Sequence, residues 1–348
     1  MATTRKKQKR ASGGLRLGLI IGGISAALIA AGCIIFCLQP AAPAGSDRWV
    51  RIPAGSSSAA VGDSLRSALG VTCGNRVYTI WRVAGGSPER AHGAYRISHD
   101  TSALTAARRI KNGSQTPVRI TFNYARDISD MASRLTRNLE IGPEALLAAC
   151  DTILPRHGFR REQFPAAFMP DTYEAYWTDD GERIVDRLLT VRNDFWNDDR
   201  RQRAADLGLT PAEAATLASI VEEETAKADG RPTVARLYLN RLSKGMLLQA
   251  DPTVKFATGN PDLRRITGRH LSIQSPYNTY LHHGLPPGPI RIADGRTIDA
   301  VLNAPRHNYI YMCAREDFSG YHNFASDYAT HQANARRYRQ ELDRRGIR

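Results

Sequence analysis

Cysteine is scarce in this sequence of 348 residues, and the five cysteines that occur form no CxxC pair. Two of them, Cys33 and Cys37, lie inside an apolar run, and the others, Cys73, Cys150 and Cys313, are far apart. Cysteine-based metal sites use closely spaced pairs, so we expect no bound metal. One isolated disulfide is an alternative to three separate thiols, and the spacing favours the thiols.

Internal repeats and long low-complexity segments are also absent. The sequence contains no nucleic-acid-binding motif, so we do not interpret the formal net charge of +14 as a sign of nucleic-acid binding. Six basic residues lie within the first sixteen positions, directly before the apolar run, which is typical of a topology signal. They are Arg5, Lys6, Lys7, Lys9, Arg10 and Arg16. The remaining excess of about +8 favours an anionic polymer, such as a phospholipid surface or a cell wall. We predict no nucleic-acid partner.

Only one long apolar run is present, at residues 17–38, and it carries no charge. About 22 residues, at 1.5 Å of rise per residue, cover a hydrocarbon core of about 30 Å. A cleaved signal peptide is the alternative, because Ala41, Ala42 and Ala44 offer small residues for cleavage. The run is long for a signal peptide, so we favour a transmembrane helix. The positive-inside rule then makes residues 1–16 a cytoplasmic basic tail and places everything after Gln39 outside.

The outer part divides by composition into three segments and belongs to the α+β class. Residues 39–48 are predicted to form a linker, residues 49–124 a small α/β module and residues 125–348 a mixed α+β domain. In the module we expect strands at 49–52, 93–97 and 118–123, and helices at 57–69 (broken by Gly62) and 101–112. In the larger domain we expect helices from Asp127, at 143–152 and at 181–206, and loops with short strands from residue 284 onward.

The most informative segment is 210–228, TPAEAATLASIVEEETAKA. Thr210 suits the N-cap position, Pro211 the first helical position, and Glu213 closes a capping box. These residues predict where the helix begins and therefore which way each later side chain points.

At about 100° per residue, Glu224 shares one stripe of this helix with the apolar residues, whereas Glu222 and Glu223 fall to either side and can be solvated. The apolar stripe comprises Ala214, Leu217, Ile220, Val221 and Ala228. Burial raises the pKa of a carboxyl group, and an acid that is protonated near neutral pH suits glycosidic cleavage. A solvated acidic helix end is the alternative. A metal site is disfavoured, because no histidine lies nearby in sequence.

Polar and aromatic residues follow this helix. A second amphipathic helix carries Val234, Leu237, Tyr238 and Leu242. Further polar side chains then interrupt the apolar runs, and aromatic rings and amides of this kind suit sugar faces and hydroxyls. They are Gln249, Asp251, Thr253, Tyr277, Asn278 and Tyr280. Ordinary loop chemistry is the alternative for each of them.

Taken together, these segments resemble the YceG-like family of MltG-type endolytic murein transglycosylases. LASIVEEET (217–225) is similar to the family's ASI-x-E-x-E-T signature, and VARLYLNRLSKGMLLQADPTV (234–254) to its V-A-x-V-F-x-N-R-L-x-x-G-M-x-L-Q-x-D-P-T-V block. FMPDTY (168–173), SPYNTY, GLPPGPI, His322-x-Phe324 and His331 follow the family order. Departures are small: Glu223 stands where Lys is frequent, and Gln332 where Asn is usual.

The resemblance implies a catalytic acid/base at Glu224, the glutamate directly before threonine. It implies substrate-binding roles for Gln249, Asp251, Thr253, Tyr277, Asn278 and Tyr280, a LysM-like module at 49–124, and no metal or other cofactor. The reaction it implies is cleavage of the MurNAc–GlcNAc β-1,4 bond within peptidoglycan strands, leaving 1,6-anhydro-MurNAc ends and terminating or trimming nascent strands. Peptidoglycan, the membrane and peptidoglycan synthases are the implied partners. The implied location is the inner membrane, with the catalytic domain periplasmic.

Two other functions stay open at this stage. One is a hydrolytic muramidase in which Asp251 activates water. The other is a membrane-anchored cell-wall-binding protein without activity.

Overall fold

The computed structural model describes residues 3–263 and 265–346, with the side chains of the first sixteen residues outside the description. The described residues combine helices with small two-stranded sheets, in agreement with the predicted α+β class. They form two compact units. The first comprises residues up to Val118 together with 176–178, and the second comprises 119–175 and 179–348.

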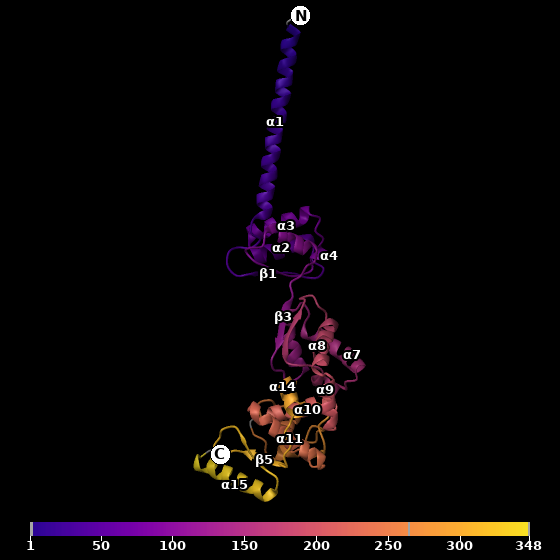
Figure 1. Cartoon of the computed structure of the whole chain (residues 1–348), viewed down its shortest axis with the longest axis vertical. Coiled ribbons are helices and arrows are strands. Elements are labelled where there is room, and N and C mark those ends of the chain that lie inside the picture. The colour runs from indigo at the N-terminus through magenta and orange to yellow at the C-terminus, as the bar shows by residue number, and fades with distance from the viewer. Residues whose placement is uncertain (1–2, 264, 347–348) are drawn as a thin grey trace. The chain divides into compact units, whose positions relative to one another are not determined.

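The chain begins with one long helix, α1 (Thr3–Leu38), drawn in indigo in Figure 1. Its segment Leu19–Leu38 is long and apolar enough to cross a membrane, and none of this segment is buried by protein. A helix that exposes apolar side chains on all sides is typical of a membrane span. From Thr3 onward, the predicted basic tail is part of helix α1. The side chains of the tail are outside the description.

Residues 39–48, predicted as a linker, are partly packed into the first unit. Pro40 forms a β-bridge with Ser102, and the backbone N–H of Ala41 donates to the carbonyl of Thr101 at 2.8 Å. Ala41 and Ala42 are fully enclosed in the core of the first unit. Their methyl groups are small enough to pack there, so the irregular connection begins after Ala42.

We expect a chain that starts at Gln39 to be soluble and folded. It keeps the bond from the Ala103 N–H to the Gln39 carbonyl, and it loses the contact of Arg76 over the Phe36 ring, worth about 0.5–1 kcal/mol. Sedimentation with vesicles after a salt wash, together with circular dichroism, checks this. A folded protein that stays with the vesicles would reveal a second membrane contact.

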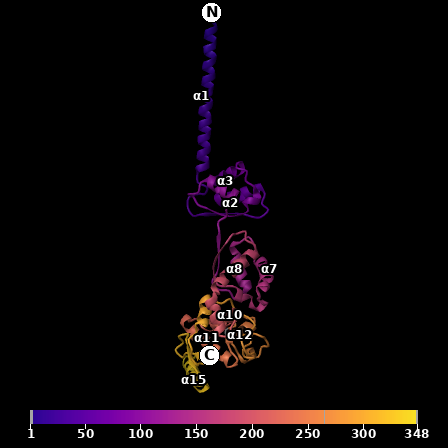
Figure 2. The ribbon, with the colours of Figure 1, turned by 45° about the vertical axis from the view of Figure 1, so that its right-hand side comes forward.

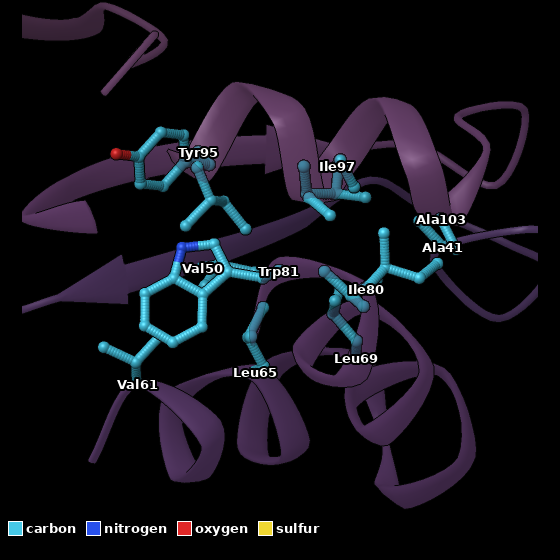
Figure 3. Packing of buried hydrophobic residues seen from close by; sticks show 14 of the residues in the cluster. Ala41, Val50, Val61, Leu65, Leu69, Ile80, Trp81, Tyr95, Ile97 and Ala103 are labelled. Carbon is cyan, nitrogen blue, oxygen red and sulfur yellow. The ribbon is translucent and has the colours of Figure 1, made fainter. Parts of the chain in front are cut away.

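The first unit is built around one antiparallel strand pair and three longer helices. Its elements are β1 (Arg48–Ile52), α2 (Ser58–Leu69), α3 (Val71–Val83), α4 (Pro88–Ala91), β2 (Gly93–Ile97) and α5 (Ala103–Lys111). β1 pairs with β2 so that Val50 lies opposite Tyr95. Figure 3 shows the indole of Trp81 among Val50, Val61, Leu65 and Tyr95, and Trp81 is fully buried.

Three details of the first unit differ from the predicted elements. Helix α2 runs through Gly62 without a break, and α5 is capped by Ser102, whose hydroxyl accepts from the Thr105 N–H. Helix α3 was not predicted. It packs closely on α2 because Gly74 has no side chain, and a Cβ there would lie 2.6 Å from the Cα of Arg66.

The second unit begins with a strand pair whose two strands enclose five helical segments in the chain, and two further helices follow. The elements are β3 (Val118–Phe122), α6 (Ile128–Leu135), η1 (Thr136–Asn138), α7 (Pro143–Ile153), η2 (Leu154–His157), η3 (Arg161–Ala167), β4 (Asp171–Ala175), α8 (Gly181–Phe195) and α9 (Asp198–Asp206). β3 pairs with β4. The single helix predicted at 181–206 is two helices, because Asn197 caps a new helix by accepting from the Arg200 N–H.

The rest of the second unit surrounds helix α10. Its elements are α10 (Pro211–Glu224), η4 (Ala228–Gly230), α11 (Arg231–Ser243), α12 (Asp251–Ala257), α13 (Gly268–Leu271), α14 (Gly295–Leu302), β5 (Tyr311–Ala314), β6 (His322–Ala325) and α15 (Tyr328–Arg344). β5 and β6 form an antiparallel hairpin. The region after residue 284 therefore contains two helices, α14 and α15, where loops and short strands were predicted.

Helix α10 is the buried centre of this part of the chain, and Figure 2 shows it beside α11. Every side chain from Ala214 to Val221 is buried. The hydroxyl of Ser219 accepts from the N–H of Ile290 at 3.0 Å, which ties the loop before α14 to the helix. The end of α10, which carries the three glutamates, is thus bonded to a distant segment of the chain.

Candidate active site

The predicted start of α10 is present. Thr210 and Glu213 form the reciprocal capping box, and Pro211 occupies the first turn. The helix ends at Glu224, however, with Thr225 extended as its C-cap. Ala228, which was assigned to the apolar stripe, is therefore beyond the helix and is exposed in η4.

Glu222 and Glu223 both interact with one arginine. Arg291 lies 3.5 Å from Glu222 and donates to Glu223 at 2.9 Å. Glu222 also accepts from the backbone N–H of Asp294 at 3.0 Å, and its side chain is only 8% exposed. The expectation that Glu222 is solvated is therefore wrong, because the loop carrying Arg291 covers it. Glu223, at 33%, keeps more contact with solvent.

Glu224 has a different environment. Its carboxylate accepts a hydrogen bond from the Tyr238 hydroxyl at 2.6 Å. Burial is the main reason why the pKa of Glu224 rises to about 7, and the charge of Asp251 raises it further. The Tyr238 hydrogen bond and the charge of Arg241 act in the opposite direction on this pKa. A pKa of about 7 suits a general acid working near neutral pH.

A cleft of about 270 Å³ opens in front of Glu224. Its walls come from α11, from the loop before α12, from Tyr280 and from the β5–β6 hairpin. The lining residues are Glu224, Leu237, Tyr238, Arg241, Leu248, Gln249, Asp251, Tyr280, Met312, Cys313, Ala314 and His322. Three residues predicted to bind substrate, Gln249, Asp251 and Tyr280, thus share one cleft with Glu224.

Arg241 holds these walls together. Its guanidinium donates to the carbonyl of Ile310 at 2.6 Å, just before β5, and to the carbonyls of Leu247 and Leu248 at 3.0 Å. It also donates to the side-chain oxygen of Gln249 at 3.2 Å. Because Arg241 is nearly buried, these bonds fix the loop and the hairpin on α11.

The polar groups of the cleft wall are held in defined positions. Gln249 has a φ of 52°, a left-handed conformation that is uncommon for a residue with a side chain and that costs about 1–3 kcal/mol. Its backbone N–H donates to the carbonyl of Thr279, which helps to hold this conformation. Asp251 accepts from the Tyr280 hydroxyl at 2.7 Å. Residues with backbone strain of this kind are found more often at functional sites than elsewhere.

The other three predicted residues do not line this cleft. Thr253 is fully buried and bonds to the carbonyl of Ala250 and the hydroxyl of Thr279. Asn278, also buried, donates to the carbonyls of Leu271 and Ile273. Tyr277 packs against Phe256, with ring centroids 4.7 Å apart. Their contacts support the loops that carry Asp251 and Tyr280.

Tyr238, Arg241 and His322 line the cleft but were not predicted as site residues. Tyr238 appeared only as a core position of its helix, although a buried tyrosine hydroxyl needs a polar partner, and this was a usable signal. Arg241 lies in the same helix, and a buried guanidinium likewise needs polar partners. His322, whose pKa is lowered by burial, reaches the cleft only through the β5–β6 pairing, opposite Ala314.

Within residues 3–263 and 265–346, no three His, Cys, Asp or Glu side chains converge in a way that could hold a metal ion. The described cysteines are all free thiols. What the site offers is acid–base chemistry from the Glu224 carboxyl group, with the Asp251 carboxyl group and other hydrogen-bonding side chains in the same cleft.

Comparison with known proteins gives consistent matches. The model of the YceG-like family matches residues 50–337. An endolytic murein transglycosylase of Bacillus subtilis (strain 168) is 41% identical over 102 residues, which are 29% of this chain and 28% of that protein. One of Streptococcus pneumoniae (strain D39) is 28% identical over 158 residues, 44% of this chain and 28% of that protein.

The fold has a counterpart among solved structures. The crystal structure of a yceG-like protein from Listeria monocytogenes superimposes with a TM-score of 0.54 at 21% identity, covering 82% of this chain and 98% of that chain. The aligned segments of the two curated relatives span only 28% of each relative's own length.

Proposed function

The chain belongs to the YceG-like family, and from this premise we propose that it is an endolytic lytic transglycosylase of murein. It cuts the β-1,4 bond between MurNAc and GlcNAc inside glycan strands and leaves 1,6-anhydro-MurNAc ends. The observation that carries this proposal is the Glu224 carboxyl group in a polar cleft with a pKa of about 7. The names of the two curated relatives support it.

In the first step Glu224 acts as a general acid. Its proton goes to the glycosidic oxygen, the bond between C1 of MurNAc and that oxygen breaks, and GlcNAc leaves with a free 4-hydroxyl group. The N-acetyl group of MurNAc assists at C1. Below about pH 7 the acid is protonated in a substantial fraction of molecules, as this step requires.

In the second step the same carboxylate acts as a base. The C6 hydroxyl of MurNAc attacks C1 and displaces the acetamido oxygen from it, a new C1–O6 bond closes the anhydro ring, and the hydroxyl proton returns to Glu224. Atoms balance without water, so one carboxyl group suffices where a glycoside hydrolase uses two. Tyr238 holds the carboxylate in place through its 2.6 Å hydrogen bond.

Gln249, Asp251 and Tyr280 would hold the sugar and its acetamido group, because their side chains line the Glu224 cleft. Thr253, Tyr277 and Asn278 would act through the loops that they support. The α1 helix would anchor the enzyme in the inner membrane, with its N-terminus in the cytoplasm and the catalytic unit outside. The LysM-like nature of the first unit, its binding of glycan, and the partnership with peptidoglycan synthases belong to the same proposal.

The size distribution of isolated glycan strands after incubation with the full chain in detergent tests this function. Endolytic cleavage shortens the strands throughout, whereas cleavage from an end releases disaccharides. Strands that are bound but keep their length would favour the cell-wall-binding protein and contradict the enzyme.

Replacing Tyr238 with Phe is expected to move the alkaline limit of activity upward by about one pH unit. A hydrogen bond to a charged group contributes about 1.5–3 kcal/mol, and this one stabilises the carboxylate form of Glu224. Its loss raises the pKa of Glu224, so the acid stays protonated to higher pH. The pH dependence of strand cleavage measures the shift, and Tyr309→Phe, at an exposed ring, is the matched control. An unchanged profile for Tyr238→Phe would contradict this assignment.

A further inference from the structure

A second cleft, of about 340 Å³, lies in the same unit as the Glu224 cleft and has no role in the mechanism above. Its lining includes Tyr124, Arg126, Glu223, Lys255 and Phe256. We call it the Lys255 cleft.

The two clefts adjoin along the chain. Glu224 lines the first cleft and Glu223 the second, and in the same way Asp251 lines the first and Pro252 the second. The end of α10 and the start of α12 therefore form a ridge with one cleft on each side. Neighbouring Cα atoms are 3.8 Å apart, so the backbone at the end of α10 and at the start of α12 is shared by the two clefts.

The Lys255 cleft has an unneutralised positive charge. Glu223 is paired with Arg291 at 2.9 Å, and Asp127 accepts from the N–H of Asp130 at the start of α6. Arg126 lies 3.9 Å from Asp127, at the limit of an ion pair. For Lys255, no carboxylate of the described chain lies within 4.0 Å of its ammonium group. The lining thus offers one unpaired and one weakly paired cation to a ligand.

Aromatic surface completes the Lys255 cleft. Phe256 is 36% exposed and Tyr124 is 42% exposed. Phe256 is backed by Tyr277, and Tyr124 by the Arg291 guanidinium at 4.1 Å from the ring centroid. Two supported rings beside two cations suit a ligand that combines apolar groups with carboxylates.

We propose that the Lys255 cleft binds the stem peptide of the saccharide next to the scissile bond, with Lys255 and Arg126 pairing with its carboxylates. This inference rests on the proposed function and names the part of murein that the second cleft takes. Murein stem peptides carry free carboxylates and alanine methyl groups, which match the cations and the rings. The site then distinguishes strands that carry peptides from bare glycan.

The test compares the affinity of the full chain for two probes, murein strands that carry stem peptides and the same strands stripped of peptides by an amidase. Glu224→Gln is the background, so that binding is measured without turnover. Lys255→Ala is expected to weaken binding of the peptide-bearing strands about two- to fivefold, as for an exposed charge pair, and Lys255→Glu more. The weakening for bare strands is expected to be smaller, and the difference should shrink at high salt.

Lys244→Ala, at an exposed lysine after α11 and outside the Lys255 cleft, is the matched control and should change neither affinity. Equal weakening for both probes, or none for either, would overturn the inference. Failure of the proposed function is a separate result: the wild-type chain would bind the strands without shortening them.

Discussion

We expect Glu224→Gln to abolish strand cleavage while the protein stays folded. Gln has nearly the same shape as Glu and can still accept the Tyr238 hydrogen bond, so packing in the cleft is kept. What it cannot do is give up a proton and take it back. Loss of one general acid or base removes about 10²–10⁴-fold in rate. Because Glu224 serves in both steps, the loss is expected at or beyond the upper end of this range.

Glu223→Gln is the matched control, because it makes the same chemical change one residue away. Glu223 is paired with Arg291 and faces away from the Glu224 cleft, so this variant should keep most of the activity. Cleavage is measured as shortening of purified strands. A Glu224→Gln variant that cleaves at near wild-type rate would contradict both the mechanism and the assignment from helix register.

Thermal unfolding provides an independent check that Glu224→Gln is folded. The pKa of Glu224 is about 7 in the folded chain and near 4.5 when unfolded. A raised pKa means that the folded state binds more protons between these values, so the contribution of Glu224 to stability falls as pH rises from about 4.5 to 7. Gln has no such dependence. The variant should therefore gain stability relative to the wild type from pH 5 to pH 8.

Arg291→Met is expected to cause a large loss of stability in the second unit, about 3–5 kcal/mol. Arg291 neutralises Glu222, whose side chain is 8% exposed, and removing the arginine leaves that charge enclosed without a cation. At about 2–4 °C per kcal/mol for a unit of this size, the melting temperature should fall by about 10 °C. Differential scanning calorimetry measures this change.

The double variant Glu222→Gln/Arg291→Met separates charge burial from lost packing. Most of the stability should return, because no buried carboxylate is left unpaired and Glu223 is solvated enough to stand alone. Arg296→Met serves as the control, since Arg296 pairs with Asp294 at a side-chain exposure of 87% and should change little. If the double variant were as unstable as Arg291→Met alone, packing of Arg291 on Tyr124 would explain the loss instead.

The position of Glu224 in the site was predictable because its causes are local. The Thr210 cap determines where α10 begins, and helical geometry then places Glu224 in line with Leu217 and Val221. Gln249 and Asp251 were predictable as polar residues that interrupt the apolar run between α11 and α12.

The remaining features depend on contacts between distant segments. Glu222 is covered because Arg291, far along the chain, folds back onto α10. His322 reaches the cleft through hairpin pairing, and Ala41 is buried because its backbone bonds to Thr101. No periodicity encodes such contacts. The burial of Thr253 and Asn278 likewise follows from how their loops close, and a sequence pattern does not distinguish a buried amide from an exposed one.

The most direct test of the central claim is mass spectrometry of strand ends formed in ¹⁸O-labelled water. If Glu224 drives ring closure by the C6 hydroxyl, the new MurNAc ends are 1,6-anhydro sugars that contain no ¹⁸O, and the Glu224→Gln chain forms none. New reducing MurNAc ends that carry ¹⁸O would mean that water attacks C1, as in a muramidase in which Asp251 activates water, and would contradict the transglycosylase.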